Sequence, residues 1–162
     1  MCRPQTCGVY CLTHESGGSR VALEPPNPQS PDNDDAGIIR CGSHADYVSL
    51  KVAQGILWVI LEGEPRGDDL RLCFERALAT GTITTSMRTF VDMLRFTGSV
   101  DWPSIHAIKD MAVWGADGQA RTAYLTRDTM AVMLLRALVD FFPLTRHRFF
   151  ADREQALLWL RA

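Results

Sequence analysis

Apolar residues recur with regular periods from about residue 45 onward. Val48, Leu50 and Val52 alternate with polar residues, a pattern typical of a half-buried strand. A Gln-Gly turn at 54–55 then leads into residues 56–61, a continuous β-favouring run suited to a central strand. These two strands are predicted to form a hairpin.

Helical periodicity alternates with strand-like runs over the rest of the chain. Apolar residues on one face predict four helices, over residues 70–78, 102–111, 129–142 and 153–160. Runs of β-favouring residues predict three further strands, over residues 87–96, 120–126 and 147–151. Capping residues support the helix starts, with Asp68 or Asp69 at the first helix and Asp152 with Gln155 at the last.

The predicted element order is β-β-α-β-α-β-α-β-α. Strands that alternate with helices indicate a mainly parallel sheet with right-handed crossovers, and the antiparallel first strand is expected at an edge of that sheet. We therefore predict an α/β fold with a mixed, mainly parallel five-stranded sheet and about four helices. This domain is expected to span residues 44–162.

Residues 1–43 differ in composition from the remainder. Five prolines lie between positions 4 and 31, and residues 27–35 form the polar stretch NPQSPDNDD. Such a segment buries too little apolar surface to offset the entropy of ordering it. A disordered leader is therefore expected over residues 1–43, ahead of a single folded domain.

Composition and charge narrow the class of protein. A length of 162 residues with 46% hydrophobic residues suits one domain with its own core. The net charge of -2 provides no basic field, which argues against nucleic acid as a partner. No apolar run approaches the roughly 20 residues that span a bilayer, and the first 18 residues lack the apolar segment of a secretory signal. We therefore expect a cytoplasmic protein without a membrane span.

The five cysteines are expected to be free thiols, because their number is odd and no export signal is present. Cys2, Cys7 and Cys11 lie near His14, but structural zinc sites usually have a second, matching pair of ligands. Neither a metal ion nor another cofactor is therefore predicted.

Three segments of the chain share a pattern with a known family: residues 96–102 (FTGSVDW), 121–126 (RTAYLT) and 146–160 (RHRFFADREQALLWL). They resemble the SpoIIAA-like proteins, in which a last strand ending in Phe leads to a helix with an Ala, a Trp and a Leu on its buried side. Here these residues are Ala156, Trp159 and Leu160. The resemblance covers residues 47–160, mostly through core positions. It implies the STAS fold of the anti-sigma-factor antagonists, which is similar to the lipid-carrying Sec14 domains.

The resemblance also implies a regulatory surface. The antagonists carry a phosphorylatable Ser or Thr in an Asp-Ser-Ser-Gly type sequence at the start of the second helix. Here residues 97–101 (TGSVD) occupy that place, with the acidic residue after the hydroxyls. Thr97, Ser99, Asp101 and Trp102 are the candidate phosphoacceptor and partner surface, because a phosphate dianion is favoured near a helix N-terminus. The alternative is plain turn chemistry with Asp101 as a helix cap.

A second candidate site is apolar and consists of Met111, Trp114, Met130 and Met133. Thioethers adapt to irregular ligands and exposed tryptophans anchor partners, so these residues are candidates for an apolar pocket or an interface. Met130 and Met133 lie in a helix so apolar that it must pack on the sheet in any case, which makes core positions the alternative. Trp114 is equally compatible with burial under a neighbouring helix.

These features rank three classes of function. The first is a non-enzymatic protein-interaction or regulatory module with a protein partner or a second copy of itself. The second is a small carrier or sensor of a hydrophobic, lipid-like ligand. An enzyme ranks third and is not predicted, because Asp92, His106 or Cys73 would have to converge in a cleft and no catalytic sequence motif supports this.

Overall fold

The computed structural model describes residues 37–84, 86–99, 102–111 and 120–162, apart from the side chains of residues 104, 108, 134 and 138. All of them belong to one compact unit, Asp34–Ala162. The described strands are β1 (Ile39–Gly42), β2 (Tyr47–Ala53), β3 (Ile56–Gly63), β4 (Arg88–Phe96), β5 (Arg121–Leu125) and β6 (Arg146–Phe150). The described helices are α1 (Gly67–Ala79), α2 (Trp102–Asp110), α3 (Thr129–Val139) and α4 (Arg153–Arg161).

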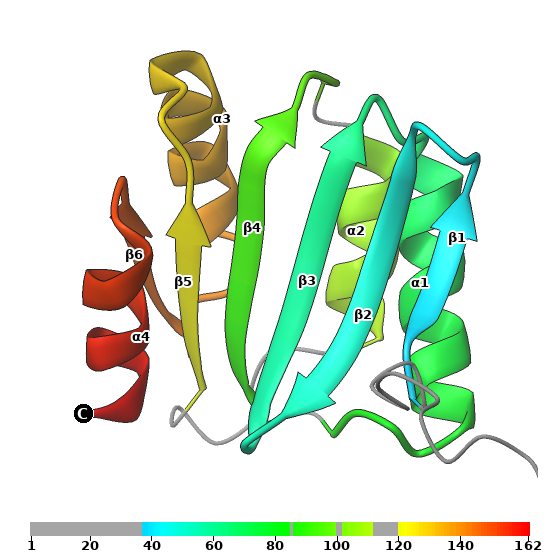
Figure 1. Cartoon of the computed structure of the whole chain (residues 1–162), viewed down its shortest axis with the longest axis horizontal. Coiled ribbons are helices and arrows are strands. Elements are labelled where there is room, and N and C mark those ends of the chain that lie inside the picture. The colour runs from blue at the N-terminus through cyan, green and yellow to red at the C-terminus, as the bar shows by residue number, and fades with distance from the viewer. Residues whose placement is uncertain (1–36, 85, 100–101, 112–119) are drawn as a thin grey trace, which may run out of the picture. The chain divides into compact units, whose positions relative to one another are not determined.

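These strands form one sheet in the order of the sequence, β1-β2-β3-β4-β5-β6 (Figure 1). The β1–β2 and β2–β3 pairs are antiparallel, and β3 to β6 are parallel. The predicted mixed, mainly parallel architecture with four helices is therefore confirmed. The predicted hairpin is β2–β3, and its turn residues Gln54 and Gly55 have φ values of 53° and 72°, the positive values that suit the twist of a two-residue hairpin.

The predicted strand number and leader boundary are wrong. The described residues form six strands and not five, and the additional strand β1 lies within the segment 1–43. Ile39 and Cys41 pack against the core while Arg40 between them is exposed, and four residues are too few to reveal this alternation. β2 is therefore an inner strand and not the edge. Residues 1–36 lie outside the part of the chain that the structure describes.

One face of the sheet is covered by α1, α2 and α3. Right-handed crossovers between parallel neighbours in sequence order place every connecting helix on the same face. Buried side chains of these helices form the main core with the strands beneath them, among them Cys73, Phe74, Ala77, Ile105, Leu135, Val48, Leu50, Val59, Val91 and Tyr124. The carboxyl ends of the parallel strands and the helix starts that follow them therefore meet at one end of the sheet.

The other face carries α4, which packs on β4, β5 and β6. Its Ala156 and Leu160 are buried against Phe90, Ala123 and other sheet residues, and Trp159 is partly buried beside them, so the predicted inward positions of this helix are confirmed. Asp152 caps α4 as predicted, accepting a hydrogen bond from the Gln155 backbone N–H at 2.9 Å. In Figure 1, β2 and β3 face the viewer with no helix in front of them.

Candidate functional site

The candidate site lies where β3 and β4 end. Residues 64–67 lead from β3 into α1, and residues 97–99 follow β4 on the way to α2. The Thr97 backbone N–H donates a hydrogen bond to the Gly63 carbonyl at 2.8 Å, which holds the two exits together. Ligands of open α/β sheets commonly bind at this end, because loops rather than regular elements form the surface there.

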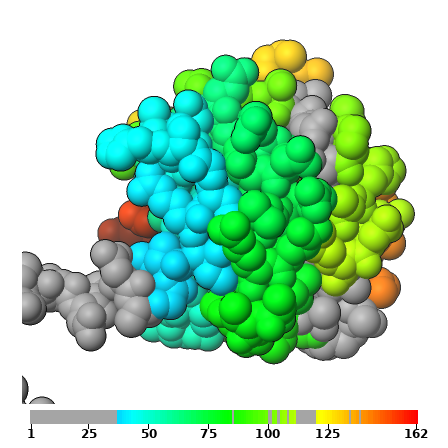
Figure 2. All heavy atoms as spheres, turned by 90° about the vertical axis from the view of Figure 1, so that its right-hand side faces the viewer, coloured from blue at the N-terminus to red at the C-terminus, as the bar shows by residue number. Residues whose placement is uncertain are grey.

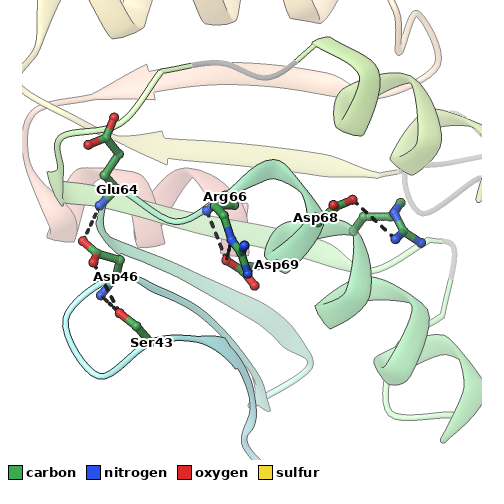
Figure 3. A network of polar contacts seen from close by, with 7 residues as sticks. Ser43, Asp46, Glu64, Arg66, Asp68 and Asp69 are labelled. Carbon is green, nitrogen blue, oxygen red and sulfur yellow. Dashed lines mark hydrogen bonds and ion pairs between the residues drawn. The ribbon is translucent and has the colours of Figure 1, made fainter.

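The turn between β1 and β2 adds a carboxylate to the two loops. Asp46 Oδ1 accepts a hydrogen bond from the Glu64 backbone N–H at 2.9 Å, as Figure 3 shows. Ser43 Oγ in turn accepts from the Asp46 N–H at 2.9 Å and lies 3.3 Å from Asp46 Oδ2. Asp46 Oδ1 therefore ties the β1–β2 turn to the backbone after β3, Oδ2 contacts the Ser43 hydroxyl within the turn, and the turn becomes one wall of the site.

Gly63 allows the close approach of this turn. Its φ is +66°, in the left-handed region, and a Cβ at this position would lie 2.3 Å from Asp46 Oδ1 and 2.7 Å from the Ala45 carbonyl oxygen. A side chain would therefore collide with the turn as well as strain the backbone. The backbone at the end of β3 therefore requires glycine at position 63.

The first turn of α1 forms the opposite wall. Asp69 Oδ2 accepts a hydrogen bond from the Arg66 backbone N–H at 3.1 Å and lies 3.6 Å from Arg66 Nε. Asp68 Oδ1 lies 3.4 Å from Arg71 Nη2 one turn further along. Asp69 therefore stabilises the helix start from inside its first turn, whereas the sequence predicts that Asp68 or Asp69 precedes the helix as its cap.

A polar hollow of about 450 Å³ opens between these walls. Its lining is Asp46, Glu64, Pro65, Arg66, Gly67 and Ser99. The hollow thus combines two carboxylates, a guanidinium, a hydroxyl and the N-terminus of a helix, a set that suits polar and charged groups of a partner or ligand. We refer to this lining as the polar hollow.

Comparison with solved structures identifies the architecture. A protein of the DUF3478 family from Shewanella loihica, described as having a SpoIIAA-like fold, matches with a TM-score of 0.51 at 17% sequence identity, over 74% of this chain and 96% of that one. The fold is SpoIIAA-like. At this level of identity the match supports the fold alone, and it confirms the resemblance inferred from the sequence. No family model and no curated protein sequence gives a significant match to the chain.

The SpoIIAA-like domain brings two of the predicted surface residues to the site. Thr97 and Ser99 are both exposed, and Ser99 lines the polar hollow. Trp102 is half-buried, packs against the main core, and has its ring centroid 6.0 Å from that of Phe141. Asp101 lies outside the described residues.

The described members of the predicted apolar site, Met111, Met130 and Met133, have different surroundings. Met130 and Met133 are 61% and 65% exposed on α3, so they do not line an enclosed pocket, and only their use in an interface stays a prediction. Met111 is partly buried against the main core. Trp114 lies outside the described residues.

The three residues that an enzyme would require do not converge in the SpoIIAA-like domain. Asp92 pairs with Arg153 of α4 at 3.8 Å, on the face opposite to the main core. Cys73 is buried in that core on α1, and His106 stacks edge-on against Phe141 from α2. Among the described residues, no group of three or more His, Cys, Asp or Glu side chains is placed to hold a metal ion. No described helix is long and apolar enough to cross a membrane.

The sequence did not indicate Asp46, Glu64 and Arg66 as site residues. Asp46 and Glu64 are 18 positions apart and meet because β2 pairs with β3 in a register that places Tyr47 opposite Glu62. Arg66 and Ser99 follow different strands and come together only in the lining of the hollow. One signal was present, since residues 63–67 (GEPRG) follow a central strand directly and the exits of such strands are common sites of binding.

Proposed function

We propose that this SpoIIAA-like domain is a non-enzymatic protein-interaction or regulatory module whose partner surface is the polar hollow. The position of Ser99 supports this most directly, because its exposed hydroxyl lines the hollow beside the first residues of α1. A lipid-carrier function has less support, since the hollow is lined by charged side chains and Met130 and Met133 are exposed.

The charge of the hollow defines the partner. Asp46 and Glu64 line it, Asp69 pairs with Arg66 in the first turn of α1, and Arg66 is the guanidinium in the lining. This excess of carboxylates suits a protein partner that presents Lys or Arg, because complementary charge increases the association rate and the specificity.

Phosphorylation of Ser99 is the proposed switch, with the exposed Thr97 as the alternative acceptor. A phosphate adds a charge of about −2 and three acceptor oxygens. The Arg66 side chain is 84% exposed and its Nε lies 3.6 Å from Asp69 Oδ2, so solvent screens this ion pair on the arginine side. A phosphate on Ser99 therefore draws Arg66 away from Asp69 and changes both the shape and the charge of the partner surface.

A photo-crosslinking residue in place of Pro65 tests the surface, because Pro65 lines the hollow. In host cells it is expected to capture one protein, and the same residue in place of the exposed Glu154 on α4 is the matched control. With that partner purified, Glu64→Lys is expected to weaken binding about tenfold, and Glu154→Lys to leave it unchanged. Equal capture and equal affinity at both positions would refute the proposed surface.

The switch has a separate readout. Trypsin releases residues 96–109 as one peptide that contains Thr97 and Ser99. In protein purified from its host, part of this peptide is expected to carry a phosphate that fragmentation assigns to Ser99 or Thr97. A phosphate found only at other sites of the chain would reject the switch and leave the partner surface to be judged by crosslinking.

A further inference from the structure

Two buried thiols meet where the edge strand β1 packs on α1. Cys41 is 5% exposed and Cys73 is 0% exposed, and both are free. Figure 2 shows β1 and α1 next to each other on this side of the molecule, and both contribute to the main core. The pair joins segments that are 32 positions apart in the sequence.

The Cys73 sulfur lies among the backbone groups that surround Cys41. Cys73 Sγ is 3.5 Å from the Ile39 carbonyl oxygen and 3.5 Å from the Val48 carbonyl oxygen. Val48 is the residue directly opposite Cys41 in the β1–β2 ladder. Arg76, three residues after Cys73 on α1, reaches Cys41 Sγ with its Nη1 at 3.7 Å, so the two cysteine side chains occupy the same part of the core between β1 and α1.

The two thiols have different surroundings. Burial raises the pKa of Cys73, which keeps this thiol protonated. Arg76 Nη1 donates a hydrogen bond to Cys41 Sγ at 3.7 Å. A guanidinium beside this sulfur stabilises the negative charge on it during attack on an oxidant.

We propose that Cys41 and Cys73 form a redox-active pair, which a hydroperoxide converts into a disulfide between β1 and α1. The Cys41 thiolate attacks one peroxide oxygen, the O–O bond breaks, and the other oxygen leaves as an alcohol or water after taking a proton. Cys41 is then a sulfenic acid. The Cys73 sulfur attacks the Cys41 sulfur, the S–O bond breaks, and the hydroxide leaves as water with the Cys73 proton. Two thiols and one hydroperoxide give one disulfide, one water and one alcohol or second water.

The edge position of β1 provides the route for the oxidant. β1 is four residues long and, among the strands that the structure describes, pairs with β2 alone, so it has few hydrogen bonds to break in a local opening. Opening exposes Cys41 first, since Cys73 lies deeper on the helix side. Cys41 is therefore the attacking residue and Cys73 the resolving residue.

The disulfide would act on the polar hollow from a distance. The turn that holds Asp46 begins directly after β1, and the N-terminus of α1 forms the opposite wall. A bond between Cys41 and Cys73 ties the elements behind both walls together and reduces their relative motion. The chemistry needs no partner in the hollow, so it can be tested independently of the proposed function.

Peptide mapping after peroxide treatment tests the pair in the full chain. Trypsin places Cys41 in residues 41–51 (CGSHADYVSLK), Cys73 in residues 72–76 (LCFER), and Cys2, Cys7 and Cys11 together in residues 1–20. Reduced protein is treated with hydrogen peroxide, alkylated and digested. The expected product is residues 41–51 joined to residues 72–76, two hydrogens lighter than the sum of the two peptides.

Variants assign the roles of the residues. Cys73→Ser is expected to accumulate a sulfenic acid on residues 41–51 that dimedone traps, and Cys41→Ser to leave residues 72–76 unoxidised. Arg76→Gln is expected to slow oxidation of Cys41 about tenfold without preventing the disulfide. Residues 41–51 or 72–76 crosslinked mainly to residues 1–20, or both fully alkylated after oxidation of residues 1–20, would overturn the proposal. Because the crosslink is mapped in the unsubstituted chain, this outcome does not depend on how the variants fold.

Discussion

At the scale of the residue, Gly63 gives a sharp test of how the polar hollow is closed. Gly63→Ala adds a Cβ that would lie 2.3 Å from Asp46 Oδ1 in a backbone with φ of +66°. Steric strain and collision together are expected to lower the free energy of unfolding by about 3 kcal/mol, measured by urea denaturation. Gly55→Ala is the matched control, with φ of +72° but no atom within 4 Å, and should lose only about 1 kcal/mol. Equal losses would mean that the β1–β2 turn moves aside without resistance.

His147 makes the stability of the domain depend on pH. Its Nδ1 lies 3.1 Å from Tyr124 Oη, and burial lowers its pKa below 6.5, an effect that contact with the Phe142 backbone only partly offsets. The unfolded chain therefore binds the proton more readily than the folded one, so stability is complete above pH 6.5 and falls as the pH drops towards the lower folded value. Tyr124 remains protonated throughout, since burial raises its pKa.

Urea titrations at pH 7.5 and 5.5 measure this dependence. His147→Gln is expected to reduce the difference in unfolding free energy between the two pH values, whereas His106→Gln on the exposed side of α2 should leave it unchanged. If the two variants keep the same dependence on pH as the unsubstituted chain, His147 is not its source.

At the scale of the element, α4 tests how the second face of the sheet is held. Leu160 is fully buried against the sheet and Leu158, two residues away on the same helix, is 73% exposed. Leu160→Ala is expected to lower the unfolding free energy by about 3 kcal/mol, because it removes buried methyl groups and leaves a cavity. Leu158→Ala should change it by less than about 0.5 kcal/mol. Equal effects in thermal or urea denaturation would show that α4 does not pack as described.

Elements with a long apolar period could be predicted from the sequence, and short ones could not. The hairpin of β2 and β3 and the four helices follow from local periodicity and turn residues, which act within a few positions. β1 has only the alternation of Ile39, Arg40 and Cys41, and its strand form depends on β2 and α1, which lie later in the chain. Asp46 could not be predicted as a site residue for a similar reason, because its hydrogen bond to Glu64 joins residues 18 positions apart.

At the scale of the whole molecule, one sheet is shared by two hydrophobic cores. The main core lies under α1, α2 and α3, and the second lies under α4, with β3, β4 and β5 contributing side chains to both. If the strands separate, both cores lose the sheet side chains that bury them. Both cores are therefore expected to unfold in one cooperative transition. Loss of an edge strand should then lower the free energy of unfolding of the whole domain.

This sharing makes β1 a test of where the domain begins. A chain of residues 38–162 retains β1, and a chain of residues 43–162 lacks it but keeps Ser43 and the Asp46 turn. The shorter chain loses the buried side chains of Ile39 and Cys41 and exposes the backbone of β2 as a new edge. It is expected to be less stable by about 3 kcal/mol and to self-associate through β2, as sedimentation at increasing concentration would detect. If the two chains have equal urea midpoints and the shorter one stays monomeric, β1 is not part of the stable domain and the predicted start at residue 44 is correct.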